Sequence, residues 1–349
     1  MPTEEQSSGG EIPSETGSSR ALGVMSMFVI PSKEDPLFAP LAEVIVRANK
    51  PFDDIGSAFR ANIEGLISTV SMPYKLAHTS SIRAHWRRIH MAARFEMMAL
   101  DAEAEVERLS SPNPKPKAEE TDEAQEKRLQ EGAFERGSTK MSEFVRSAEG
   151  KAAIRRDTLD FLEALQSDRS LTGAANELIL QGVVLCWGAF EVLARDCFVA
   201  HLDAAPARSI TLLADPVAKR RFELSKVSLE TLAAHSFDLS GRMGTLLAQQ
   251  QDLSDIHSVK SIYQALFSND AKLSDALSDS DLRLLSLRRN LIIHQRGIVD
   301  AKYKASTNCS QGVGDRLTLL PNDLNKHLST TTMAVIAILD AVSVRRRSG

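Results

Sequence analysis

The stretch that most limits what this chain can fold into runs from Thr172 to Leu202, TGAANELILQGVVLCWGAFEVLARDCFVAHL. It contains no proline, and its apolar residues from Leu178 through Phe198 surround most of a helix's circumference. A helix that is apolar on all sides belongs in a core or in an interface between subunits. Aromatic residues make up only 5% of the chain, and Ala, Leu, Glu and Arg are common. We therefore predict an all-α protein rather than a β-sandwich or barrel.

Composition divides the chain into four parts. The first is acidic and rich in Ser and Gly, with almost nothing that could form a core. Helical patterns broken at Pro51 and Pro73 follow, then closely spaced prolines and dense charge, then strongly helical patterns again. The predicted parts are a disordered tail (1–22), an N-terminal helical region without an assigned role (23–110), a charged linker that passes into a solvated helix (111–140) and a C-terminal helical domain (141–349).

Charge and cysteine content limit the class and the location of the protein. The formal net charge of −4 excludes a globally basic nucleic-acid coat, although it allows a local basic site. Three cysteines without a CxxC pair form neither a disulfide framework nor a zinc site, which favours the cytoplasm and no metal or other cofactor. No apolar stretch reaches the roughly 18 residues that a membrane span needs, so we predict no membrane association.

The segment Asp281–Gly297, DLRLLSLRRNLIIHQRG, has clear helix start and stop signals. Asp279, Ser280 or Asp281 can cap its amino end. Gly297 stands where a left-handed residue would close it. We predict a helix over this segment.

Two kinds of side chain share this predicted helix. Leu284, Leu287 and Leu291 form an apolar stripe, which His294 continues. Arg289 and His294 are five positions apart, so they project about 140° apart on an ideal helix. Both can act on one atom only if a second copy of the helix contributes or if the end of the helix is distorted.

The surroundings of the segment are basic. Residues 281–304 contain six Lys or Arg against two Asp, a local charge of about +4. We assign Arg288, Arg296 and Lys302 to substrate binding. A purely structural role for the motif is the alternative, because cations at a helix carboxyl end are favoured by about 0.3–1 kcal/mol through the helix dipole alone.

The string RRNLIIHQRGIVDAKY resembles the signature of the HEPN superfamily, an Arg-polar-x(3)-His motif near the end of a core helix. The stretch Leu185–Phe198 resembles the first core helix of that family. The similarity extends over roughly Thr172–Val344, and the nearest group is the stand-alone bacterial RiboL-PSP-HEPN proteins.

This resemblance implies a bundle of four to five helices that dimerises and brings two Arg–His motifs into one cleft. Catalytic members are metal-independent endoribonucleases, often in toxin–antitoxin or antiphage systems. Carried over, His294 transfers a proton, Arg289 binds the phosphate and Asn290 assists. Arg296 stands where one toxin branch of the family has a tyrosine, so regulation through that tyrosine is not expected.

The residue types of the motif also suit RNA cleavage when the HEPN resemblance is set aside. RNA is cut without a metal when its 2′-hydroxyl attacks the adjacent phosphate, and histidine can supply the base or the acid because it titrates near neutral pH. A guanidinium can stabilise the charge that gathers on the phosphate. We therefore expect an endoribonuclease that acts on RNA as a homodimer, with an antitoxin or another protein as a further partner.

Several alternatives stay open. Many HEPN domains are non-catalytic modules that bind RNA or protein, and a purely structural helical protein is a weaker third hypothesis. Glu191 and Asp196 either reach the active cleft as supporting residues or pair with Arg195 or a neighbouring helix. The basic helix Ser81–Arg94, which contains Trp86, forms either a face for RNA or a partner or a solvated face, and we favour the solvated face.

Overall fold

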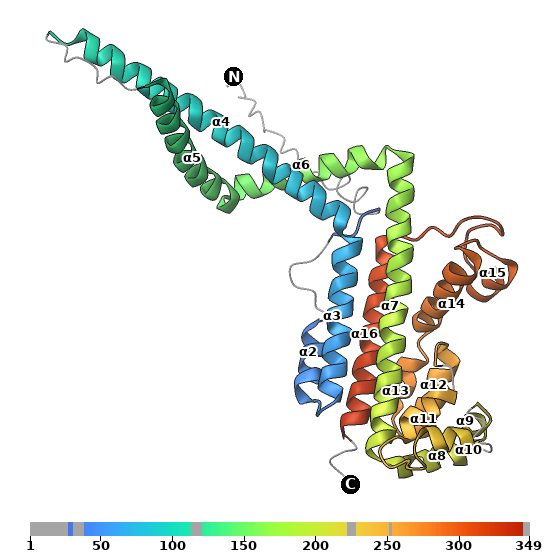
Figure 1. The fold of residues 1–349 in the computed structure, drawn as a ribbon. Coiled ribbons are helices and arrows are strands. Elements are labelled where there is room, and N and C mark those ends of the chain that lie inside the picture. The colour runs from blue at the N-terminus through green and yellow to red at the C-terminus, as the bar shows by residue number, and fades with distance from the viewer. Residues whose placement is uncertain (1–26, 31–37, 113–120, 222–227, 251–252, 345–349) are drawn as a thin grey trace, which may run out of the picture. The chain divides into compact units, whose positions relative to one another are not determined.

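The computed structural model of the chain describes residues 27–30, 38–112, 121–221, 228–250 and 253–344. Every regular element in these ranges is a helix, apart from one isolated bridge between Ile298 and Arg316 (Figure 1). The predicted all-α class is therefore confirmed. The described chain divides into two compact units, one over Met72–Thr172 and one that combines residues from Met25–Ser71 with Gly173–Gly349.

This division differs from the one that composition suggested. The predicted N-terminal region 23–110 is shared between the units, because the apolar faces of its first helices pack into the second unit. The predicted linker 111–140 includes most of a 25-residue helix. The predicted disordered tail, 1–22, lies outside the described residues.

The first unit consists of three helices, α4 (Met72–Ser110), α5 (Asp122–Arg146) and α6 (Ala148–Gln166). Thr121 caps α5 by accepting from the Ala124 amide at 3.3 Å. Figure 1 shows α5 lying along α4. The charged sequence of α5 conceals a stripe of small and apolar residues with four-residue spacing, and this stripe is why the helix packs rather than remaining solvated. The buried residues of α5 are Leu129, Ala133, Gly137 and Met141.

The second unit is built around four helices, α2 (Phe38–Arg47), α3 (Phe52–Val70), α7 (Arg169–Ala204) and α16 (Pro321–Val344). Figure 1 shows α3, α16 and α7 running beside one another. Helix α16 begins at Pro321, as the preference of proline for the first turn of a helix predicts. At Gly182 of α7, an added Cβ would lie 2.9 Å from a Leu324 methyl carbon of α16.

Helix α7 is the core helix that its composition predicts. Trp187, Phe190 and Phe198 are fully buried, and so are Cys186 and Cys197. The Trp187 indole donates to the Ser254 carbonyl oxygen at 3.1 Å. Burial raises the pKa of the Cys186 thiol to about 12.

By length and composition alone, α7 is long and apolar enough to cross a membrane. This finding corrects the prediction that no apolar stretch of the chain is long enough for a span. In its most apolar window, 56% of the residues are buried inside the protein. A core helix meets the same criterion, so α7 is only weak support for a span.

Shorter helices complete the second unit and bring the motif segment against the core. The described residues between Ala204 and Ser240 contain four short helices. Two separate helices follow between Met243 and Leu266, because Asp255 caps a new start by accepting from the His257 and Ser258 amides. The remaining helices are η1 (Pro206–Arg208), α8 (Ser209–Ala214), α9 (Pro216–Arg221), α10 (Leu229–Ala234), α11 (Met243–Gln250), α12 (Ile256–Leu266), α13 (Ala271–Leu277), α14 (Ser280–Gln295) and α15 (Ala301–Thr307).

Candidate functional site

Helix α14 carries the Arg–His motif, and both of its ends are fixed by the local sequence. Asp279 is the cap, since its carboxylate accepts from the Asp281 amide at 2.7 Å. At the other end the first left-handed residue is Arg296, with φ 55°, rather than Gly297 as predicted. Gly297 is also left-handed, with φ 71°, and its amide donates to the Leu291 carbonyl oxygen at 3.1 Å. The helix therefore stops one turn after Leu291, which leaves His294 in its last turn.

The predicted apolar stripe of α14 is only partly buried. Leu291 lies in the core and Leu287 packs against it, while Leu284 is half-buried and His294 is exposed. Leu282 and Leu285, which are outside the predicted stripe, are fully buried, and α12 and α16 contact this helix. The part of the stripe from Leu287 to His294 also lines a pocket.

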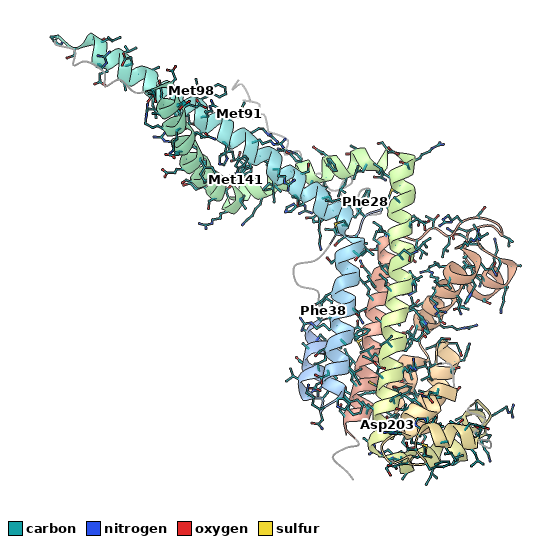
Figure 2. The ribbon with its side chains drawn as sticks, in the orientation of Figure 1. Phe28, Phe38, Met91, Met98, Met141 and Asp203 are labelled. Atoms are coloured by element: carbon teal, nitrogen blue, oxygen red, sulfur yellow. The ribbon has the colours of Figure 1, made fainter. Side chains whose placement is uncertain are left out.

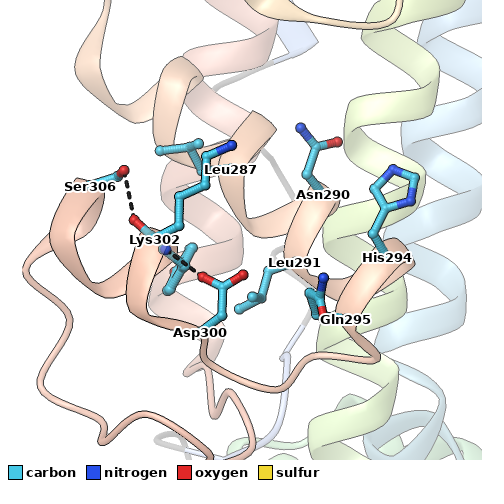
Figure 3. Close-up of a pocket in the computed structure, with 9 residues that line it drawn as sticks. Leu287, Asn290, Leu291, His294, Gln295, Asp300, Lys302 and Ser306 are labelled. Atoms are coloured by element: carbon cyan, nitrogen blue, oxygen red, sulfur yellow. Dashed lines mark hydrogen bonds between the residues drawn. The ribbon is translucent and has the colours of Figure 1, made fainter.

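This pocket has a volume of about 330 Å³ and lies between α14 and the segment that contains α15 (Figure 3). Asn290 and His294 are one helical turn apart, and both line it. Lys302 and Ser306 line it from α15. The full lining is Leu287, Asn290, Leu291, His294, Gln295, Asp300, Lys302, Tyr303 and Ser306.

The α15 side of the pocket is held by its own hydrogen bonds. Asp300 caps α15, since its carboxylate accepts from the Tyr303 amide at 2.6 Å. The Ser306 hydroxyl donates to the Lys302 carbonyl oxygen at 2.8 Å. Burial raises the pKa of the Tyr303 phenol, and the neighbouring Arg288 guanidinium opposes that effect. Lys302 is exposed and forms no ion pair among the described residues, so its ammonium group is available to an anion.

Arg289 reaches the pocket only through its neighbour. Its guanidinium donates to the Asn290 side-chain oxygen at 3.0 Å. It also lies 3.6 Å from the Glu191 carboxylate on α7. One chain therefore gathers Asn290 and His294 at the pocket and does not bring Arg289 into its lining, as the helical spacing predicts.

Of the three residues assigned to substrate binding, Arg288 and Arg296 do not line the pocket. The Arg288 side chain is only 13% exposed and is held by Asp323 at 3.1 Å and by His327 at 2.8 Å. This pairing corrects its assignment, because a buried, bonded guanidinium supports the fold instead of meeting a ligand. Arg296 is exposed but does not line the pocket, and only Lys302 does.

The two acidic residues of α7 that were considered as supporting residues, Glu191 and Asp196, also have different positions. Glu191 contacts Arg289, so the structure brings it to the motif. Asp196 is exposed and five residues further along, which turns it to a different side of the helix. Asp196 does not line the pocket.

Sequence reasoning missed the residues behind the pocket. His327 on α16 is only 1% exposed and accepts from Arg288. Burial, together with the positive charge of Arg288, lowers the pKa of its imidazole to about 4. Tyr303 is the last residue of RRNLIIHQRGIVDAKY, but no periodicity marks it as part of the site. The spacing of Asp323 and His327, four residues apart on the last helix, was the available signal.

Within the described ranges, no group of three His, Cys, Asp or Glu side chains is placed to hold a metal ion. Comparisons with family models, with curated proteins and with solved structures found no match to this chain. The function is therefore inferred from the motif and from the geometry of the pocket.

Proposed function

We propose that this protein is a metal-independent endoribonuclease of the HEPN type, from a toxin or antiphage-defence system, that cuts RNA as a homodimer in the cytoplasm. The observation that carries the proposal is the pocket in which His294 and Asn290 lie one turn apart and face Lys302. Arg289, bonded to Asn290, stands next to this group. These are the residue types that RNA cleavage through the 2′-hydroxyl requires.

In this mechanism His294 takes the proton from the 2′-hydroxyl or donates a proton to the leaving 5′-oxygen. It is exposed, so a ribose can reach its imidazole nitrogens. The Lys302 ammonium and the Arg289 guanidinium stabilise the negative charge on the pentacoordinate phosphate. Asn290 orients the phosphate or the ribose and, through its hydrogen bond, fixes the direction of Arg289.

A second chain completes the site in this proposal. Arg289 and His294 diverge on one helix, and Glu191 holds the guanidinium on the α7 side. Two copies of α14 related by a two-fold axis would place the Arg289 of one chain beside the pocket of the other. An antitoxin or another protein partner would then act by covering this cleft.

The second candidate is a non-catalytic module that binds RNA or protein, and one observation favours its protein-binding form. The basic excess of the segment is smaller in the structure than in the sequence, because Arg288 pairs with Asp323 and Arg289 pairs with Glu191. The Lys304 ammonium also donates to the Gln311 carbonyl oxygen at 2.9 Å. A site with fewer free cations binds phosphates more weakly.

Incubating the full chain with RNA in the presence of EDTA tests the choice between the two functions. Cleavage that EDTA does not change is the expected result, since no metal takes part. The measurement is the appearance of fragments on a denaturing gel, with binding followed in parallel by a gel shift. Binding without cleavage would support the module, and cleavage that EDTA abolishes would overturn the proposed mechanism.

Mixed dimers test the shared site. His294→Ala and Arg289→Ala chains should each be inactive alone, and co-refolding them should restore a substantial fraction of wild-type cleavage. The reason is that half of the composite sites in a mixed dimer keep both residues. Cleavage by the mixture that stays at the level of the single variants would show that each chain uses its own Arg289 and His294.

A further inference from the structure

A second pocket lies in the first unit and is lined by residues of α4 and α5. Its volume is about 310 Å³, near the lower end of the roughly 300–1,000 Å³ that sites for small molecules occupy. Met91 of α4, labelled in Figure 2, lines it and is 58% exposed. We call it the α4–α5 pocket, and its lining is Trp86, Arg87, His90, Met91, Arg94, Gln130, Ala133 and Phe134.

Two stacked rings form the α4 side of this pocket. The Trp86 indole and the His90 imidazole have ring centroids 3.9 Å apart and planes inclined by 25°. His90 Nδ1 donates to the Trp86 carbonyl oxygen at 3.0 Å, which fixes the imidazole against the indole. The imidazole also lies against Gly137 of α5, where an added Cβ would be 2.7 Å from a His90 ring carbon. The indole is therefore held from one side, while 44% of the Trp86 surface is exposed.

A second exposed ring lines the pocket from α5. Phe134 is 59% exposed, and its ring centroid lies 5.8 Å from that of His90 with the planes inclined by 54°. Large aromatic side chains that stay exposed in a concave surface leave their ring faces open to a ligand. Trp86 and Phe134 together therefore favour a ligand with a flat ring.

The charge of the lining narrows the class of ligand. No Asp or Glu lines the α4–α5 pocket. Arg94 is already paired, because the Glu126 carboxylate accepts from its guanidinium at 2.7 Å. Arg87 is exposed and forms no ion pair among the described residues, and the same is true of Arg83 one turn before it. The pocket thus combines one free guanidinium with an exposed indole, which suits an anionic group attached to a flat ring.

We propose that the α4–α5 pocket binds one nucleotide of single-stranded RNA, with the base stacked on the Trp86 indole and a phosphate bound by Arg87. The Gln130 side-chain amide offers a donor and an acceptor to the edge of the base. The strand must be unpaired, because neighbouring bases cover the ring faces in a duplex. The pocket lies outside the residues that resemble the HEPN family, and binding there does not require the proposed ribonuclease function.

Tryptophan fluorescence of the full chain tests the stacking. The probe is a decamer of 2′-O-methyl adenosine, which has no free 2′-hydroxyl and so cannot be cut by the proposed mechanism. Titration should quench the emission of Trp86, whereas Trp187, the other tryptophan of the chain, is fully buried and should not respond. The Trp86→Phe chain should bind the decamer without this quenching.

Two further probes distinguish the strand from other anions. AMP should quench only at much higher concentration, because it lacks the neighbouring phosphates that the free arginines attract. A polyglutamate peptide of the same charge as the decamer should cause no quenching, because it has no ring to stack. Absence of quenching by the decamer, AMP binding as tight as that of the decamer, or equal quenching by polyglutamate would each overturn the proposal.

Variants of the pocket separate it from any other contact with RNA, with anisotropy of a labelled decamer as the readout. Trp86→Ala should weaken binding by about 5- to 150-fold, the effect of losing one base–aromatic stack, and Trp86→Phe should restore most of the loss. Arg87→Gln should reduce the slope of log Kd against log salt concentration by about 0.7, the share of one phosphate on a single strand.

Arg155→Gln is the matched control, since Arg155 is an exposed arginine of α6 that does not line the α4–α5 pocket. It should change neither the affinity nor the salt dependence. All of these substitutions are at exposed positions, so helix content measured by circular dichroism should stay the same. Wild-type affinity in Trp86→Ala, or an equal loss in Arg155→Gln and Arg87→Gln, would show that RNA does not use this pocket.

Discussion

Replacing His294 by alanine will lower the rate of RNA cleavage by about 10²- to 10⁴-fold and will leave the fold unchanged. The size of the loss is that of removing a general acid–base group. The fold should survive because His294 is exposed in the last turn of α14 and has no part in the core. The measurement is the single-turnover rate of cleavage of a labelled RNA, together with the thermal unfolding temperature.

His257→Ala is the matched control for this variant. His257 is also exposed and also lies in the second unit, but it is on α12 and does not line the pocket. Its replacement should leave the cleavage rate within about twofold, since it takes no part in proton transfer. Full activity in His294→Ala would remove the ribonuclease hypothesis and favour the binding module.

Acidification will destabilise the protein through His327, by about 2 kcal/mol between pH 7.5 and pH 5. Burial lowers the pKa of this histidine to about 4 in the folded protein, against the ordinary 6.5 in the unfolded chain. Between these values the unfolded chain binds the proton and the folded protein does not. Stability is therefore present above pH 6.5 and is lost as the pH falls toward 4.

The groups that face His327 determine how this effect is isolated. Arg288 opposes the imidazolium, and Asp323 favours it, as does Asp281 more weakly. His327→Gln keeps a neutral acceptor for Arg288 and should remove about 2 kcal/mol of the difference in unfolding free energy between pH 7.5 and pH 5. Urea unfolding at the two pH values measures it, with His257→Gln as the control. An unchanged pH dependence in His327→Gln would contradict this account.

The sequence alone predicted those elements whose local signals agree with their packing. Helix α7 is apolar on every side and contains Trp187, so burial was its only stable environment. Helix α16 begins at Pro321, which is favourable in the first turn of a helix. The capping aspartate and the left-handed end fixed α14 to within a residue or two.

The remainder depended on contacts between distant segments. Nothing local shows that Arg288 is buried, since Asp323 and His327 are brought to it by α16. The buried face of α14 was ambiguous because Leu285 and Leu287 belong to different apolar rows, and both rows contribute to the core, Leu285 fully and Leu287 only in part. The small residues of α5, such as Gly137, gave no hydrophobic signal, although they allow α4 to approach closely.

The central claim is that RNA is cut by attack of its own 2′-hydroxyl at the pocket of His294. The most direct test is an RNA with a single mapped cleavage position, compared with the same RNA carrying 2′-deoxyribose on the 5′ side of that bond. The account predicts that the first is cut to a product with a 2′,3′-cyclic phosphate and that the second resists cleavage at that position. Equal cleavage of the two, or a first product without the cyclic phosphate, would contradict it.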